Sequence, residues 1–250
     1  MKLFPRILVV LALAMIVAAQ AKAEAILYFV DVNHGTDQMA AALATLSGDT
    51  ITVATSPTDF ATKIASGTYN LGIFSAQFNY GPDYSAALVA LGTFVAGGGN
   101  AIVDSWFTPS GADIAPFDAA FTGNVNGPAV NMSAFNSGVT NPVAITNPVP
   151  PYATFSDGLS ALAGGSVTGT FSDPGNASGT DGEAAVIVGN SGRSVVNGFL
   201  NDTAGAPGEQ IYINEIQGIG ASTPPVPEPS SILLFGTGLW ALTMLALRRK

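Results

Sequence analysis

Apolar runs and amphipathic stretches alternate along the first half of the chain. Four runs, apolar or β-branched, are typical of buried strands: 26–32, 50–54, 70–75 and 100–105. Between them, apolar residues recur at helical spacing over three segments that each end at a glycine: 36–48, 56–67 and 83–97. Thr36 or Asp37 can begin the first helix, and Ser56 before Pro57 can begin the second. This order predicts an α/β fold whose right-handed crossovers give a doubly wound, mostly parallel sheet.

The pattern is less regular over residues 107–219. Many Pro, Asn, Gly and Ser residues interrupt it as far as residue 166, yet the phenylalanines of this stretch still require burial. We therefore expect one domain over 24–222, with a regular half at 25–106 and a loop-rich half at 107–219. Its expected later elements are a short helix at 157–163, strands at 167–171, 184–188 and 194–199, and a helix at 209–219. The isoleucines of that last segment also permit a strand.

The amino-terminal residues 1–23 have the pattern of a secretory signal peptide. Lys2 and Arg6 precede an unbroken apolar run over 7–19, and Ala21-Lys22-Ala23 is a small-residue cleavage site. We expect export through the Sec machinery and cleavage by signal peptidase between Ala23 and Glu24. The alternative is a membrane anchor, but the apolar run is short for a span.

A second apolar segment lies near the other end of the sequence. Residues 230–247 carry no charge and are long enough to form a transmembrane helix across the inner membrane. The basic residues 248–250 follow, and the positive-inside rule places them in the cytoplasm. Residues 223–229 contain four prolines and form a stiff, extended linker before the segment.

This ending resembles the PEP-CTERM sorting signal of Gram-negative bacteria. The matching parts are Pro227-Glu228-Pro229, the apolar segment 230–247, and the basic tip with Arg248 and Arg249. The resemblance implies that an exosortase, a membrane protease, recognises the segment and releases or re-anchors the protein at the cell surface or outside the cell. The alternative is an ordinary anchor beside a proline-rich linker.

Charge excludes several classes of partner. The region 24–222 keeps 16 of the 17 acidic residues and 2 of the 8 basic residues, a net charge of −14. Nucleic acid and anionic membrane surfaces require Lys and Arg, so neither is an expected partner. The excess of acids favours solubility and attracts cations. The chain has no Cys and one His, which excludes thiol nucleophiles and multi-His metal sites.

Four segments of the region resemble the class I glutamine amidotransferase-like fold, including its ThuA-like relatives. They are strands and glycine turns at 69–75, 94–103, 192–199 and 212–216. The resemblance implies a flavodoxin-like order of elements and, in the enzymes of that fold, a Cys nucleophile with His and Glu partners. This chain carries Asp104-Ser105-Trp106 where the nucleophile is expected, and it has no Cys. Amidotransferase activity is therefore not expected.

Ligands of an open parallel sheet bind beyond the carboxyl ends of its strands. Polar residues that follow the expected strands are Asp31, Asn33, His34, Asp37, Ser75, Gln77 and Asp104. His34 is the one candidate base at neutral pH, Ser75 or Ser105 the candidate nucleophile, and Asp104 the candidate acid. No G-x-S-x-G elbow supports this arrangement, and the preferred alternative is that His34 caps or packs against the start of the first helix.

Carboxylates also suggest hard-cation sites. Asp31, Asp37 and Asp104 offer oxygen ligands for Ca²⁺ or Mg²⁺, and the loop containing Asp173 and Asp181 is a second candidate. That loop lacks the EF-hand spacing, and its Asp-Pro-Gly and Asp-Gly sequences favour a polar turn over a cation site. Asp202 and Glu215 can pair as acid and base, and Arg193 is expected to lie against a carboxylate. No cofactor is predicted apart from this possible Ca²⁺.

Three functions are compatible with the sequence. The first is an exported, exosortase-processed protein of the cell surface or of extracellular polysaccharide and biofilm, with a non-catalytic domain. The second is a hydrolase of carbohydrates or esters that uses His34, Ser75 and Asp104 on a degenerate amidotransferase-like scaffold. The third is a cation-dependent matrix or adhesion module.

Overall fold

The computed structural model describes residues 24–105, 111–146, 155–173, 179 and 181–219. The predicted signal peptide, the proline-rich linker, the apolar segment 230–247 and the basic tip lie outside the described residues. Within the part that is described, no helix combines the length and the apolar character that a membrane span needs.

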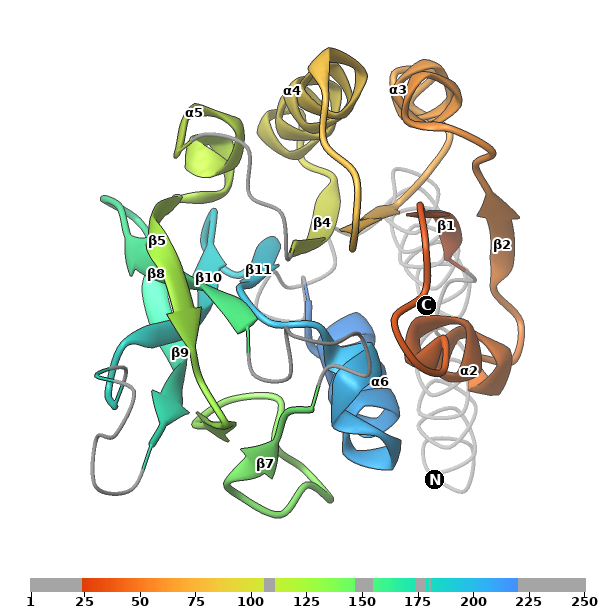
Figure 1. Cartoon of the computed structure of the whole chain (residues 1–250). Coiled ribbons are helices and arrows are strands. Elements are labelled where there is room, and N and C mark those ends of the chain that lie inside the picture. Colours follow the sequence, from red (N-terminus) through yellow and green to blue (C-terminus); the bar gives the residue numbers. More distant parts are fainter. Residues whose placement is uncertain (1–23, 106–110, 147–154, 174–178, 180, 220–250) are drawn as a thin grey trace, which may run out of the picture.

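The domain is a mixed α/β fold with a central sheet (Figure 1). Its strands are β1 (Ala25–Val30), β2 (Thr50–Val53), β3 (Leu71–Ala76), β4 (Asn100–Ser105), β5 (Ala119–Asn126), β6 (Ala129–Met132), β7 (Val143–Ala144), β8 (Phe155–Ala161), β9 (Ser166–Ser172), β10 (Ala184–Gly189) and β11 (Ser194–Asn197). Its helices are α2 (Gln38–Thr45), α3 (Pro57–Ile64), α4 (Pro82–Ala96), α5 (Gly111–Ile114) and α6 (Ala206–Gly218), with 3₁₀ turns η1 (Ala115–Phe117) and η2 (Asn201–Ala204).

The sheet is parallel in one half and antiparallel in the other. Strands run in the order β2-β1-β3-β4-β11-β10-β9-β6-β7, and β5 and β8 pair beside β10. All pairings from β2 to β11 are parallel, and those beyond β11 are antiparallel. The expectation of a mostly parallel sheet therefore holds only for the first part. The change from parallel to antiparallel pairing occurs between β11 and β10. A tight turn joins these two strands directly, and Asn190 and Ser191 in it both adopt positive φ.

Helices cover both faces of the parallel half, as the alternating pattern predicts. Helices α3 and α4 lie on one face, and α2 and α6 lie on the other (Figure 1). Phe60 and Leu91 pack in the core beneath α3 and α4, whereas Met39 and Tyr212 pack in the core beneath α2 and α6. The doubly wound arrangement is thus confirmed for this half.

The helix starts follow the predicted capping chemistry. The side chain of Asp37 accepts a hydrogen bond from the Ala40 amide, and that of Ser56 accepts one from the Asp59 amide. Of the two predicted first caps, Asp37 rather than Thr36 performs the role. Helix α2 ends at Thr45 instead of continuing to Gly48.

One predicted element has the wrong type. Residues 157–163 were expected to form a short helix, but Phe155–Ala161 forms β8 and pairs antiparallel with β5 from Asn126 to Ala119. Pairing with a distant strand overrides the weak helical preference of this segment. The segment 209–219, in contrast, is the predicted helix, and it belongs to α6.

The backbone at Gly198 lies very close to the backbone at Asp157, and replacement of Gly198 by Ala tests this close approach. Its amide donates to Ala185, its carbonyl accepts from the Asp157 amide at 2.6 Å, and an added Cβ would stand 2.1 Å from the Asp157 carbonyl oxygen. We expect Gly198→Ala to lower the free energy of unfolding by about 3 kcal/mol, measured by urea denaturation.

Gly81→Ala is the matched control. Its backbone is extended, and the nearest atom to an added Cβ is a movable Asp83 carboxylate oxygen at 3.1 Å. We expect this substitution to lower the free energy of unfolding by less than about 1 kcal/mol. Equal losses at both positions would contradict the close approach at Gly198.

Candidate functional site

A group of buried polar side chains lies on one face of the sheet, towards the carboxyl ends of β3, β4 and β11. The strand register places Ser75 beside Asp104, and Asp104 beside Asn197, in one row across three parallel strands. Helix α6 brings Tyr212 and Glu215 to the row, and η2 brings Asp202 near it. We call this set the buried acid cluster: Ser75, Gln77, Asp104, Asn197, Asp202, Tyr212 and Glu215, each at most 3% exposed.

Asp104 is at the centre of the cluster. Its Oδ2 accepts hydrogen bonds from the Tyr212 hydroxyl at 2.5 Å and from the Ser75 hydroxyl at 3.1 Å. Glu215 lies nearby and accepts from Nδ2 of Asn197 at 3.2 Å. Among the described residues, Oδ1 of Asp104 and Oε1 of Glu215 have no hydrogen-bond partner. The cluster therefore holds more acceptors than donors.

Gln77 connects the cluster to the first loop. Its Nε2 donates to Ser75 at 3.2 Å and to Asp202 at 2.5 Å, while its Oε1 accepts from the His34 amide at 2.9 Å. Asp202 also accepts from the Gln38 amide at 2.9 Å, at the start of α2. One side chain thus joins the loop after β1, the end of β3 and the turn η2.

Burial dominates the electrostatics of these acids. Loss of solvation raises the pKa of Asp104 and of Glu215 well above the usual range, and it raises that of Asp202 to about 6. Burial, followed by the charge of Asp104, raises the pKa of the Tyr212 hydroxyl. The environment therefore favours the neutral forms of Asp104 and Glu215.

The two cations of the described domain lie elsewhere. Lys63 pairs with Asp59 at 2.6 Å on the surface of α3. The Arg193 guanidinium donates to the Val95 carbonyl oxygen. The expectation that Arg193 lies against a carboxylate is wrong for the described residues: Lys63 rather than Arg193 forms an ion pair there, and the carbonyl that Arg193 contacts near the end of α4 also accepts from the Gly98 amide at 3.0 Å.

The candidate triad of His34, Ser75 and Asp104 is only partly assembled. Ser75 donates to Asp104, as nucleophile and acid partner would require. Gln77 lies between Ser75 and the loop of His34, however, and the His34 ring packs edge-on against Phe78 with centroids 5.6 Å apart. The side chain of Ser105 lies outside the described residues. The catalytic roles of these residues remain predictions.

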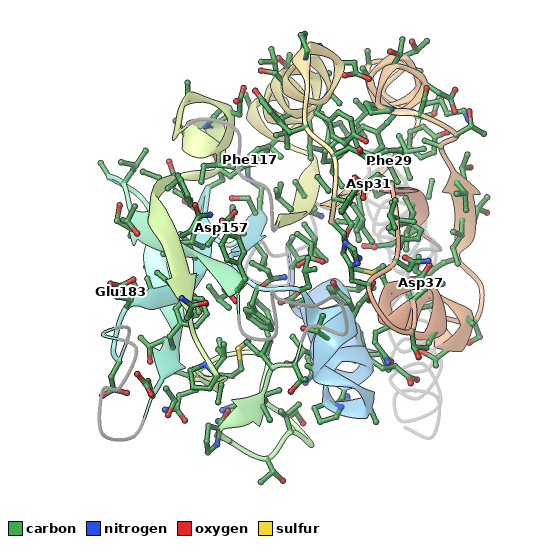
Figure 2. All side chains as sticks on the ribbon, in the orientation of Figure 1. Phe29, Asp31, Asp37, Phe117, Asp157 and Glu183 are labelled. Atoms are coloured by element: carbon green, nitrogen blue, oxygen red, sulfur yellow. The ribbon has the colours of Figure 1, made fainter. Side chains whose placement is uncertain are left out.

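Asp31 and Asp37 have structural partners, and their role in cation binding stays a prediction. Asp31 accepts from the backbone amides of residues 77, 78 and 79 at 2.7–3.1 Å and so fixes the loop after β3. Asp37 caps α2 and accepts from the Tyr28 hydroxyl at 3.1 Å. Figure 2 shows them at the end of β1 and the start of α2.

The second candidate cation loop shows a turn-like contact. The Asp173 amide donates to the Asp181 carboxylate at 2.9 Å, and residues 174–178 and 180 between them lie outside the described residues. Among described positions, no three His or acidic side chains gather as metal ligands. Ca²⁺ binding here remains a prediction.

Sequence reasoning missed the central roles of Tyr212 and Asn197. The expected helix at 209–219 contains Tyr212 and the expected strand at 194–199 contains Asn197, but neither residue was a candidate for the site. Asp202 and Glu215 were expected as an acid–base pair. They instead flank Asp104, which is within electrostatic reach of both. Strand register places Asn197 beside Asp104, and the packing of α6 and η2 brings Tyr212, Glu215 and Asp202 to it; the sequence reveals neither.

The fold is shared with proteins of known structure. The chain is similar to a protein assigned as a GMP synthase component from Thermoplasma acidophilum, with 11% identity, a TM-score of 0.50, and coverage of 81% of this chain and 97% of the other. A glutamine amidotransferase from Thermotoga maritima matches with 10% identity and a TM-score of 0.48, over 79% of this chain and 84% of the other. At such identities the likeness shows the fold alone: the domain has an α/β fold similar to that of the first of these proteins.

The carboxyl-terminal residues contain a known sorting motif. Residues 225–250 match the PEP-CTERM protein-sorting motif, so the chain carries the signal of an exosortase-targeted exported protein. No curated protein matches the sequence.

Proposed function

We propose that this protein is exported, processed by exosortase and retained with extracellular polysaccharide at the cell surface, where its α/β domain acts without catalysing a reaction. The sorting motif at 225–250 carries the proposal. Sec exports the chain, signal peptidase removes residues 1–23, and the apolar segment 230–247 holds it in the inner membrane until exosortase cuts.

The buried acid cluster supports a non-catalytic domain. The Ser75 hydroxyl is almost fully buried. It donates a hydrogen bond to Asp104 and accepts one from Gln77. A general base must be able to take the proton of its nucleophile, and the burial that raises the pKa of Asp104 favours its protonated form, which cannot take that proton. The cluster thus has the character of a structural network.

Sorting is tested in the host cell by intact mass and cell fractionation. The wild type is expected to begin at Glu24, to lack the apolar tail and to appear outside the inner membrane. Replacement of Pro227, Glu228 and Pro229 by Ala is expected to leave the tail attached and the protein in the membrane. Retention of the tail by both forms would contradict exosortase processing.

A hydrolase remains the second candidate, favoured by the 3.1 Å contact between Ser75 and Asp104. It predicts that Ser75→Ala abolishes hydrolysis of ester or glycoside substrates by the purified protein. Absence of turnover in the wild type against such a panel would support the non-catalytic proposal.

A further inference from the structure

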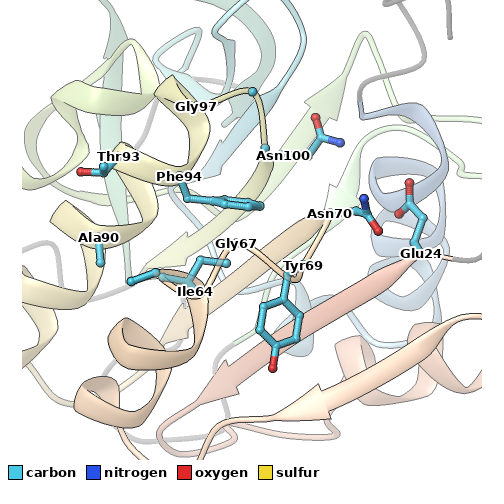
Figure 3. Close-up of a pocket in the computed structure, with 13 residues that line it drawn as sticks. Glu24, Ile64, Gly67, Tyr69, Asn70, Ala90, Thr93, Phe94, Gly97 and Asn100 are labelled. Carbon is cyan, nitrogen blue, oxygen red and sulfur yellow. The ribbon is translucent and has the colours of Figure 1, made fainter. Parts of the chain in front are cut away.

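A pocket of about 750 Å³ lies at the opposite edge of the sheet from the buried acid cluster. It opens at the amino ends of β1, β3 and β4, between the carboxyl-terminal ends of α3 and α4 (Figure 3). Its size falls within the range of small-molecule sites. Neither the sorting signal nor the acid cluster involves it.

Two aromatic rings belong to the apolar part of the lining, beside Ile64 and Ala90. Tyr69 precedes β3, and Phe94 lies in the last turn of α4; both are half-buried. A Cβ on Gly99 would stand 2.2–2.5 Å from three carbons of the Phe94 ring, so the glycine lets one ring face rest on the backbone. This support fixes the ring at the pocket wall before any ligand arrives.

Amides and one carboxyl group form the polar part. Asn70 and Asn100 lie at the starts of neighbouring strands, and Glu24 lies just before β1 (Figure 3). The Asn70 Oδ1 accepts from the Ala25 amide at 3.0 Å, which fixes that side chain and leaves its amide nitrogen available for a ligand. These groups offer hydrogen-bond donors and acceptors beside the rings.

The charge of the pocket selects against anions. No Lys or Arg contributes to its lining among the described residues. Asp49 lies behind Glu24 and accepts a hydrogen bond from the Glu24 amide at 2.8 Å. Burial, followed by the charge of Asp49, raises the pKa of Glu24. An anionic ligand would meet two acidic groups and no cation, whereas a neutral hydroxylated ligand would not be repelled.

We propose that this pocket binds a neutral saccharide unit, with its C–H faces against Phe94 and Tyr69 and its hydroxyls hydrogen-bonded to Asn70, Asn100 and Glu24. Rings beside amides and a carboxyl group match the alternating apolar faces and hydroxyl rims of a sugar. The inference rests on the proposed association with extracellular polysaccharide, and it specifies where the chain would contact the polymer.

The test is isothermal titration calorimetry of the full chain, purified in detergent. The probes are hexamers of β-linked glucose, of N-acetylglucosamine and of mannose, with a hexameric polyuronate as the anionic comparison. We expect at least one neutral hexamer to bind and the polyuronate not to bind. Binding of none of the neutral hexamers, or preferred binding of the polyuronate, would overturn the proposal.

Variants locate the binding. Phe94→Ala is expected to weaken the affinity about tenfold or more, because it removes a supported ring. Phe78→Ala is the matched control, since this ring is 49% exposed in the loop after β3, near the other edge of the sheet. Asn100→Ala is a second, milder variant in case the first does not fold. Unchanged affinity in folded Phe94→Ala and Asn100→Ala proteins would overturn the pocket as the site.

The outcome separates this inference from the proposed function. If the wild type fractionates with polysaccharide but binds no neutral hexamer, the result supports the proposed function and contradicts saccharide binding in the pocket. If the purified chain binds a hexamer but the protein in the host cell keeps its tail in the inner membrane, the result supports saccharide binding in the pocket and contradicts exosortase processing.

Discussion

The protein is expected to lose stability as the pH rises from about 4 to 8. Asp104, Asp202 and Glu215 are buried without a cation, and loss of solvation raises the pKa of each. Between the unfolded and folded pKa values of such a group, the folded state binds more protons than the unfolded state. The free energy of unfolding therefore falls with rising pH across that interval.

Asp202 sets the lower part of the pH window. Folding raises its pKa from 3.8 to about 6. The loss of stability that it causes is therefore absent below pH 4 and complete above pH 6. A shift of this size corresponds to about 3 kcal/mol, since one pKa unit is about 1.4 kcal/mol. Burial also raises the pKa of Asp104 and of Glu215 well above the usual range, so both add to the loss of stability as the pH rises.

Urea denaturation at fixed pH values measures the effect, and Glu215→Gln tests its origin. The amide keeps the shape of Glu215 and its contact with Asn197 but has no charge to bury. This variant is expected to show a flatter profile and greater stability than the wild type at pH 8.

Glu209→Gln, on the same helix but only half-buried, is the matched control and is expected to follow the wild-type profile. A wild-type stability that rises between pH 4 and pH 8 would contradict the assignment of buried neutral acids.

Replacement of Tyr212 by Ala is expected to lower the free energy of unfolding by about 3–5 kcal/mol. Tyr212 is the largest of the fully buried side chains in the described domain, and it packs beneath α2 and α6. Its removal leaves a cavity at the centre of that core and takes a hydrogen-bond donor from Asp104. Thermal and urea unfolding measure the loss.

Tyr212→Phe separates the hydroxyl from the ring. The ring still fills the core, so the expected cost is about 1–3 kcal/mol for the lost donor to a buried carboxyl group. Tyr80→Ala, at a 42% exposed position, is the control for removal of a tyrosine and is expected to cost less than about 1 kcal/mol. A Tyr212→Ala variant as stable as the control would contradict a packed cluster.

The candidate site was predictable only in part. Ser75, Gln77 and Asp104 follow from one rule, because the carboxyl ends of parallel strands meet at one edge of the sheet. The same rule grouped Asp31 and Asp37 with them, yet these two acids cap a helix and fix a loop. A short polar side chain satisfies whichever backbone amides lie within reach, and the sequence does not reveal which amides those are.

The sequence by itself determined the elements of the first half and the sorting motif at 225–250. Helical and strand periodicity there agrees with local capping by Asp37 and Ser56, so local preference and tertiary structure coincide. The sorting motif is likewise a local signal, which is why it could be recognised from its residues alone.

Tertiary structure decided the antiparallel half and the chemistry at the centre. β8 is a strand because β5 pairs with it, and Ser75, Asp104 and Asn197 stand in one row because β11 inserts beside β4. Tyr212 and Glu215 reach that row only when α6 packs on the same face. Contacts between residues far apart in the chain, such as Tyr212 and Asp104 at a separation of 108 positions, fixed these features. No local pattern in the sequence encodes the register of such contacts.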